Sequence, residues 1–107
     1  MKETDLNHII ERSINIRKAY HKLERQHHGS EWSVEEDALA FLTDAGLVGR
    51  QIMSQQGRWP SKNTEVELEH KLGECLWWIA VLAARLDLDL EDSVEKFLTK
   101  TEKLLEK

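Results

Sequence analysis

Apolar residues recur at every third or fourth position along most of this chain, a spacing typical of amphipathic α-helices rather than of β-strands. Two segments interrupt the pattern: 29–30, which begins with a glycine, and 57–61, which contains a glycine and the single proline. A third break falls at the acidic segment 87–89. The sequence therefore predicts an all-α protein with four helices, over residues 5–27, 34–56, 65–86 and 90–106.

Helix ends can be placed from capping residues. Ser33 and Glu36 have the spacing of a capping box, in which each side chain binds a backbone N–H of the first turn, so the second helix should begin near residue 34. Thr64 and Glu67 repeat this spacing ahead of the third helix. Gly57 stands where a left-handed C-terminal cap is expected, and segment 87–89 is a plausible cap for the last helix.

The apolar positions predict which faces are buried. The third helix is apolar on every side in its second half, which is typical of a helix that is central or lies at a subunit interface. We expect one domain, residues 1–107, with a four-helix-bundle architecture that forms a homodimer or homotetramer through the first and third helices. The core face of the second helix should hold Leu39, Phe41, Leu42, Ala45, Val48, Ile52 and Met53.

Composition argues against several classes of function. The net charge of -5 does not provide the positive field on which nucleic-acid binding relies. The longest apolar run, residues 75–84, is about half of what a membrane-spanning helix needs. The single cysteine, Cys75, excludes a disulfide framework. The sequence does not open on a basic-then-apolar segment, so we expect a protein that is not secreted. We expect a cytoplasmic protein with neither nucleic acid nor membrane as its partner.

Three glycines lie inside predicted helices, where each costs about 1 kcal/mol relative to alanine. Gly46 and Gly49 are in the second helix and Gly73 is in the third. Close approach of the two backbones at a helix crossing would explain them. Asp44 and Glu74 stand beside these glycines, so the pattern indicates either tight packing alone or a carboxylate pair that meets across the crossing.

Three segments, 41–48, 70–77 and 82–92, resemble the MazG-like all-α nucleoside triphosphate pyrophosphohydrolases. The likeness extends over residues 32–97. It implies a helical bundle that dimerises or tetramerises and binds Mg²⁺, or Mn²⁺, through acids on two facing helices. It further implies hydrolysis of an NTP or dNTP by water, yielding the monophosphate and pyrophosphate.

The family pattern is Glu-x-x-Glu on one helix and Glu-x-x-Asp on the next, which falls here on positions 44, 47, 71 and 74. Asp44 and Glu74 keep the acidic character of the pattern, and the resemblance implies that they are catalytic metal ligands. Leu47 and Lys71 stand where the family has its other two acids. Mg²⁺ prefers octahedral oxygen ligands. Leucine cannot supply an oxygen, and lysine carries the wrong charge.

One hypothesis is a metal site displaced by one turn. Asp37 precedes Asp44 by seven residues and Glu67 precedes Glu74 by seven, so each pair shares a helix face. His70 could add a nitrogen ligand.

The alternative hypothesis gives Lys71 a structural role. Its ammonium lies between Glu67 and Glu74 on the same helix and could reach Asp44 across the crossing, so that it stands where the family has a metal ion. The protein would then be a catalytically degenerate family member that binds a nucleotide or a protein partner without hydrolysis. The sequence leaves both hypotheses open.

Four residues are candidates for substrate binding: Trp78, Arg50, Lys71 and Trp59. Trp78 is one turn beyond Glu74 and could line a base pocket, because indole rings stack on nucleobases. Arg50 could pair with phosphate oxygens. Trp59, in the loop before Pro60, could close over a ligand. Packing in the core or between subunits explains the tryptophans equally well, and Arg50 could be an ordinary surface charge.

Overall fold

The computed structural model describes residues 5–106, and over this range the chain contains four α-helices and no strand. This confirms the predicted all-α class and places each helix within two residues of its expected bounds. Within the same range no helix combines the length and the apolar character needed to cross a bilayer. The helices are α1, Leu6–His28; α2, Val34–Gln55; α3, Thr64–Arg85; and α4, Leu90–Leu105.

Three of the expected helix caps are present. Ser33 Oγ accepts from the Glu36 N–H, and Glu36 Oε1 accepts from the Ser33 N–H, which completes the capping box of α2. Gly57 follows α2 with a φ of 76°, and the next residue, Arg58, donates its N–H to Met53 O at 2.9 Å. Asp89 Oδ1 accepts from the backbone N–H three residues on, at 3.0 Å, and so caps α4.

The second predicted capping box is wrong. Asn63, with a φ of 57° and no side-chain cap bond, is the N-cap of α3, and Thr64 is already the first helical residue. The Thr64 hydroxyl instead donates to Ser61 O at 3.0 Å. The Glu67 carboxylate accepts from Gln51 Nε2 at 2.7 Å. Both side chains therefore bind partners outside the first turn of α3.

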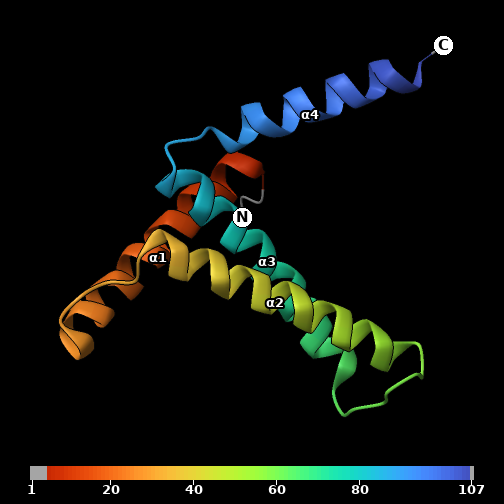
Figure 1. Cartoon of the computed structure of the whole chain (residues 1–107), viewed down its shortest axis with the longest axis horizontal. Helices are drawn as coiled ribbons and strands as arrows, with labels where there is room; N and C mark the ends of the chain where they lie inside the picture. Colours follow the sequence, from red (N-terminus) through yellow and green to blue (C-terminus); the bar gives the residue numbers. More distant parts are fainter. Residues whose placement is uncertain (1–4, 107) are drawn as a thin grey trace.

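Helix α3 occupies the centre of the fold. It packs against both α1 and α2, and α4 contacts it before extending away from the other three helices (Figure 1). The apolar residues that are fully buried among those described, Trp78, Ala80 and Val81, all belong to α3. Of the two roles expected for α3, the structure therefore shows the central one.

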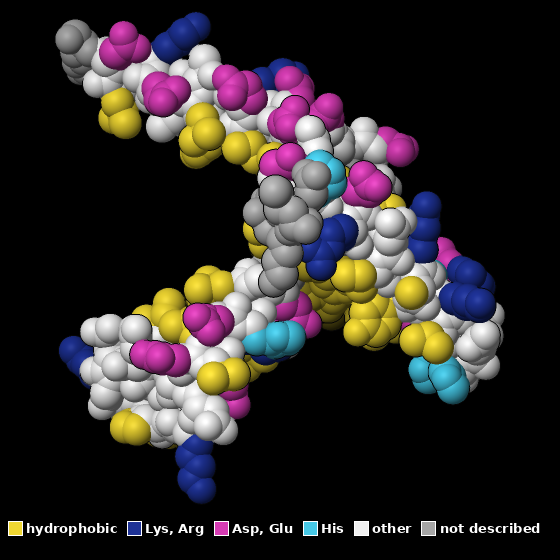
Figure 2. Space-filling view, turned by 180° about the vertical axis from the view of Figure 1, so that it is seen from behind, with side chains coloured by type: hydrophobic (Ala, Val, Ile, Leu, Met, Phe, Trp, Pro, Cys, Tyr) yellow, Lys and Arg dark blue, Asp and Glu magenta, His cyan; other side chains and the backbone are white. Residues whose placement is uncertain are grey.

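The predicted core face of α2 is largely wrong. Leu39 and Leu42 are 65% and 66% exposed, and Ile52, Met53 and Ala45 are exposed as well. Phe41 and Val48 are half-buried, whereas the residues of α2 that are fully buried are Asp37 and Ser54. The reason is that the inward side of α2 binds its neighbours through polar groups, which turns much of the apolar surface outward. Figure 2 shows hydrophobic side chains gathered on the surface of the molecule.

The proposed close approach at the glycines is also wrong. A β-carbon built at Gly46, Gly49 or Gly73 would meet no other atom within 4 Å, and all three residues are exposed. They lie on the outward sides of their helices, whereas Asp44 and Glu74 are half-buried at the crossing. The two carboxylates therefore approach each other without the help of these glycines.

Candidate functional site

Helices α2 and α3 bring Asp44, Lys71 and Glu74 together. Lys71 Nζ lies 2.9 Å from Asp44 Oδ1 and 2.9 Å from Glu74 Oε1. The lysine and both acids are half-buried. One ammonium thus bridges a carboxylate on α2 and a carboxylate on α3. We call these three residues the Lys71 triad.

Both oxygens of Asp44 have donors, because the Trp78 indole N–H donates to Oδ2 at 2.8 Å. Burial works against the charged carboxylate, but the hydrogen bonds from Lys71 and Trp78 outweigh it and lower the pKa of Asp44 below its usual value. Hydrogen bonds to Glu74 and Asp44 raise the pKa of Lys71. Asp44 and Lys71 are therefore both ionised at neutral pH, and the triad is a charged contact.

The remaining residues expected to help bind a metal do not join the triad. Asp37 lies in a separate cluster on α2, and Glu67 is bound to Gln51 Nε2. His70 has a 74% exposed side chain, and its Nε2 is 3.7 Å from Glu74 Oε1. Across residues 5–106, no three His, Cys, Asp or Glu side chains are grouped closely enough to hold a metal ion.

A divalent cation does not fit the donors of the Lys71 triad. Two carboxylates are too few to replace most of the six oxygens that Mg²⁺ prefers, and a positive group already lies between them. The side chain of Leu47, one turn after Asp44, lines a pocket together with Lys71 and provides no ligand there. The local chemistry is that of an ion pair between helices.

An aromatic pocket of about 230 Å³ adjoins the triad. The Trp77 and Trp78 rings are tilted at 58° with centroids 4.5 Å apart, and Tyr20 meets Trp77 edge-on at 6.0 Å. Glu74 lines the pocket and so connects it to Lys71. Flat ring surfaces of this kind suit a planar apolar group. The residues lining the pocket are Arg17, Tyr20, Glu24, Trp32, Glu74, Trp77 and Trp78.

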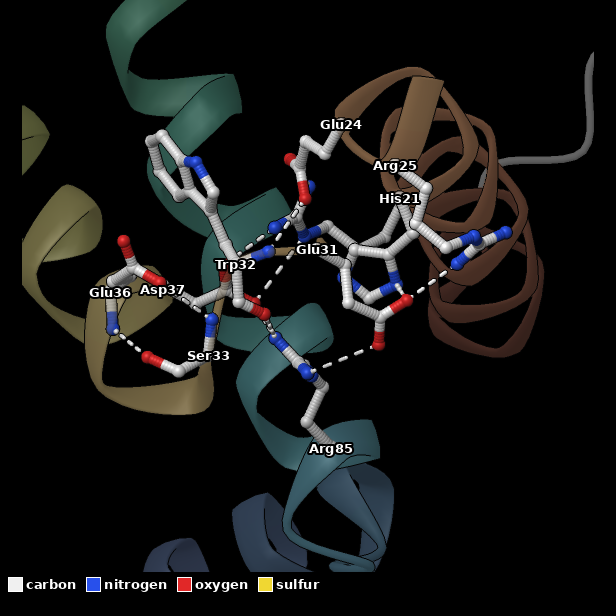
Figure 3. Close-up of polar contacts among 10 residues, drawn as sticks. His21, Glu24, Arg25, Glu31, Trp32, Ser33, Glu36, Asp37 and Arg85 are labelled. Atoms are coloured by element: carbon white, nitrogen blue, oxygen red, sulfur yellow. Dashed lines mark hydrogen bonds and ion pairs between the residues drawn. The ribbon is translucent and has the colours of Figure 1, made fainter. Parts of the chain in front are cut away.

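A second charged cluster joins α1, α2 and α3 around Asp37, which is fully buried (Figure 3). Arg17 donates to both oxygens of Asp37, through Nη2 to Oδ1 at 2.7 Å and through Nε to Oδ2 at 3.3 Å. Arg85 donates to Oδ2 at 2.8 Å. Two arginines, one from α1 and one from α3, thereby bind one carboxylate of α2.

The same arginines fix the loop between α1 and α2. Arg85 Nη1 donates to Trp32 O at 2.9 Å, and Glu24 accepts from both the Trp32 N–H and Arg17 Nη1. Burial opposes charge on Arg17, but its bonds to Asp37 and Glu24 outweigh this and raise its pKa. Burial likewise opposes charge on Glu24, but the bonds from Trp32 and Arg17 lower its pKa. The guanidinium groups are engaged by acids of the protein.

Sequence reasoning missed this cluster. Arg17 and Arg85 are 20 and 48 residues from Asp37 along the chain, so no local spacing signals their contact. The signal that the sequence does offer is the position of Asp37, seven residues before Asp44 and therefore on the same face of α2, which indicates that Asp37 faces the neighbouring helices.

The other candidates for substrate binding lie as follows. Arg50 Nη1 donates to Trp59 O at 2.8 Å, and its guanidinium carbon lies 5.8 Å from the centroid of the Trp59 ring, which is 62% exposed. These two residues bind each other beside the α2–α3 loop. Trp78 is the buried member of the tryptophan pair, whereas Trp77 is half-buried and donates its N–H to Ser13 O at 3.2 Å.

Comparison with known proteins yields no relative: no protein-family model matches this chain, and neither a curated protein nor a solved structure is significantly similar to it. The fold and the site define an all-α protein with a lysine-bridged carboxylate pair at the crossing of α2 and α3.

Proposed function

We propose that this chain is a MazG-like helical protein in which Lys71 closes the place of the catalytic metal, so that it acts by association rather than by hydrolysis. The observation that carries this proposal is the position of Lys71 Nζ, 2.9 Å from both Asp44 and Glu74. The ammonium group of a lysine neutralises acids as a divalent metal ion does, but it neither activates water nor bridges phosphate oxygens as the metal ion would.

Electrostatics supports the same conclusion. The triad carries two carboxylates and one ammonium, so its formal charge is negative. A triphosphate chain is repelled from such a site unless a cation accompanies it. The guanidinium that lines the aromatic pocket, that of Arg17, does not offset this repulsion, because it is engaged by Asp37 and Glu24. Binding of a free nucleoside triphosphate is therefore unfavourable here.

The outward apolar surface of α2 and α3 supports association between copies of this chain. Leu39 and Leu42 on α2 and Leu72 and Leu76 on α3 are each more than 40% exposed. Apolar helix faces of this extent are typical of interaction sites. A dimer or tetramer that covers them would bury the surface that the sequence pattern assigns to a core.

A second candidate function, Mg²⁺-dependent hydrolysis of an NTP or dNTP to the monophosphate and pyrophosphate, is favoured by one observation. Asp44 and Glu74 converge on a shared partner beside an aromatic pocket that could accept a base. This function requires Lys71, whose side chain is 24% exposed, to leave the space between the acids.

Pyrophosphate release from a panel of ribo- and deoxyribonucleoside triphosphates, with Mg²⁺ or Mn²⁺, separates the two functions. The wild-type protein should release no more pyrophosphate than Asp44→Ala and Glu74→Ala, which control for contaminating hydrolases. Turnover that both substitutions abolish, in proteins that circular dichroism shows to be folded, would overturn the closed site and establish the hydrolase.

A further inference from the structure

Among the residues that the structure describes, none covers most of the apolar face of helix α4. Phe97 is 65% exposed and Leu98 is 48% exposed, and Leu104 and Leu105 are 67% and 79% exposed. No residue of α4 is buried. In Figure 2 the hydrophobic side chains of this helix gather along one edge, which borders an open notch.

The apolar positions of α4 follow the spacing of a coiled-coil seam. From Leu90 the intervals alternate between four and three residues, which keeps the side chains on one stripe of the helix. Only one member of the stripe is polar, Thr101. The stripe runs the whole length of the helix and comprises Leu90, Val94, Phe97, Thr101 and Leu104.

Charge along α4 is divided between its two halves. The first half, residues 90–97, carries three acids, Glu91, Asp92 and Glu95, and one lysine, Lys96, which pairs with Asp92. The second half carries two lysines, Lys100 and Lys103, and one acid, Glu102. A parallel pair of such helices would place acids beside acids. An antiparallel pair places the acidic half of each helix beside the lysine-rich half of the other.

We propose that α4 pairs in antiparallel fashion with α4 of a second copy of this chain. The two-fold axis passes close to Phe97 and Leu98, which lie at the middle of Leu90–Leu105. Such an interface is self-complementary, because each contact occurs twice. Charge complementarity favours α4 of the second chain, rather than its other helices, as the partner that covers this apolar face. This contact is separate from the Lys71 triad and goes beyond the proposed function.

Reversal of charge in one half of α4 tests the pairing in the full chain. Glu91→Lys with Glu95→Lys makes the helix predominantly basic, and Lys100→Glu with Lys103→Glu makes it predominantly acidic. Each double variant alone should associate about tenfold more weakly than wild type in sedimentation equilibrium, because like charges then face each other. An equal mixture of the two should associate within about threefold of wild type.

Disulfide formation tests the direction of the helices, in a Cys75→Ala background that removes the native thiol. Leu98→Cys lies next to the axis and should crosslink on oxidation. Leu105→Cys lies at the far end of the helix and should not, because the two ends of an antiparallel pair are about 24 Å apart for 16 residues. Crosslinking at residue 105, with or without crosslinking at 98, would overturn the antiparallel arrangement.

Three further results contradict the proposal. The first is a wild-type protein that stays monomeric at every concentration. The second is unchanged association of both charge variants. The third is a mixture that associates no better than its components, which would show that α4 docks on another surface. Phe97→Ala, which leaves the charges of both halves unchanged, should also weaken association by at least about tenfold.

Discussion

Lys71 Nζ lies 2.9 Å from Asp44 Oδ1, although 27 residues separate the two along the chain. The contact joins α2 to α3 at the crossing of the two helices. The Trp78 indole N–H donates to the other oxygen of Asp44, and Glu74 binds the same ammonium. Both oxygens of Asp44 and the Lys71 ammonium therefore have partners within the protein. The two helices are thus joined at their crossing by a carboxylate whose oxygens both accept hydrogen bonds from α3.

The Lys71 triad should make stability depend on pH. Because the pKa of Asp44 is lowered in the folded protein, its ionised carboxylate adds to the free energy of unfolding at every pH above the unfolded pKa of about 3.9. This contribution is lost as the pH falls through the lower pKa of the folded state. Because the pKa of Lys71 is raised in the folded protein, its ammonium adds to the free energy of unfolding at every pH below the unfolded pKa of about 10.4. This contribution is lost as the pH rises through the higher pKa of the folded state.

Asp44→Asn should therefore lower the free energy of unfolding by about 1–3 kcal/mol between about pH 5 and 9, measured by urea denaturation. The difference from wild type should shrink below about pH 4. Glu11→Gln, on the exposed side of α1, is the control and should change stability by less than about 0.5 kcal/mol. A deficit for Asp44→Asn that stays constant down to pH 2 would contradict the ion pair.

Asp37 is expected to be the most sensitive charged position of α2. Asp37→Ala leaves Arg17, which is 5% exposed, and Arg85 without their shared carboxylate, and breaking a buried pair in this way costs about 3–5 kcal/mol. Chemical denaturation should show this loss, and Asp37→Asn should retain part of the stability through its remaining oxygen. A loss below about 1 kcal/mol for the alanine variant would show that the cluster is not a structural centre.

The glycines provide a matched pair of substitutions. Gly73→Ala should raise the free energy of unfolding by about 0.5–1 kcal/mol, since the added methyl meets no atom and alanine favours helix. Gly57→Ala should lower it, because a φ of 76° strains any residue with a β-carbon. Thermal unfolding of both variants provides the measurement. Destabilisation by Gly73→Ala would indicate that another chain approaches this position.

Helix positions were predictable because their signals are local. The Ser33 cap, the Gly57 stop and the Asp89 cap each involve residues within five positions of one another. The cap of α3 failed for the opposite reason, since Thr64 is held by Ser61 and Ser54 of the loop and the preceding helix. Local spacing cannot reveal when a capping residue is already bound elsewhere.

The buried face of α2 could not be predicted from hydrophobicity. Leu39 and Leu42 mark a face that is suited to burial, but the pattern does not say whether the same chain or a second copy covers it. Asp37 and Ser54 occupy the inner face because Arg17, Arg85 and the loop supply their partners. Lys71 was a different case, since its contacts with Glu74 and Asp44 followed from helical spacing and one assumed crossing.

Calorimetric titration with Mn²⁺ tests the closed site most directly, on the wild-type protein and on the variant Leu47→Glu with Lys71→Glu. Both substituted side chains line the pocket beside the triad, so the variant would present four carboxylates in place of two and an ammonium. We expect no Mn²⁺ binding by wild type and measurable binding by the folded variant. Stoichiometric binding by wild type, or no gain of binding in the folded variant, would contradict the closed site.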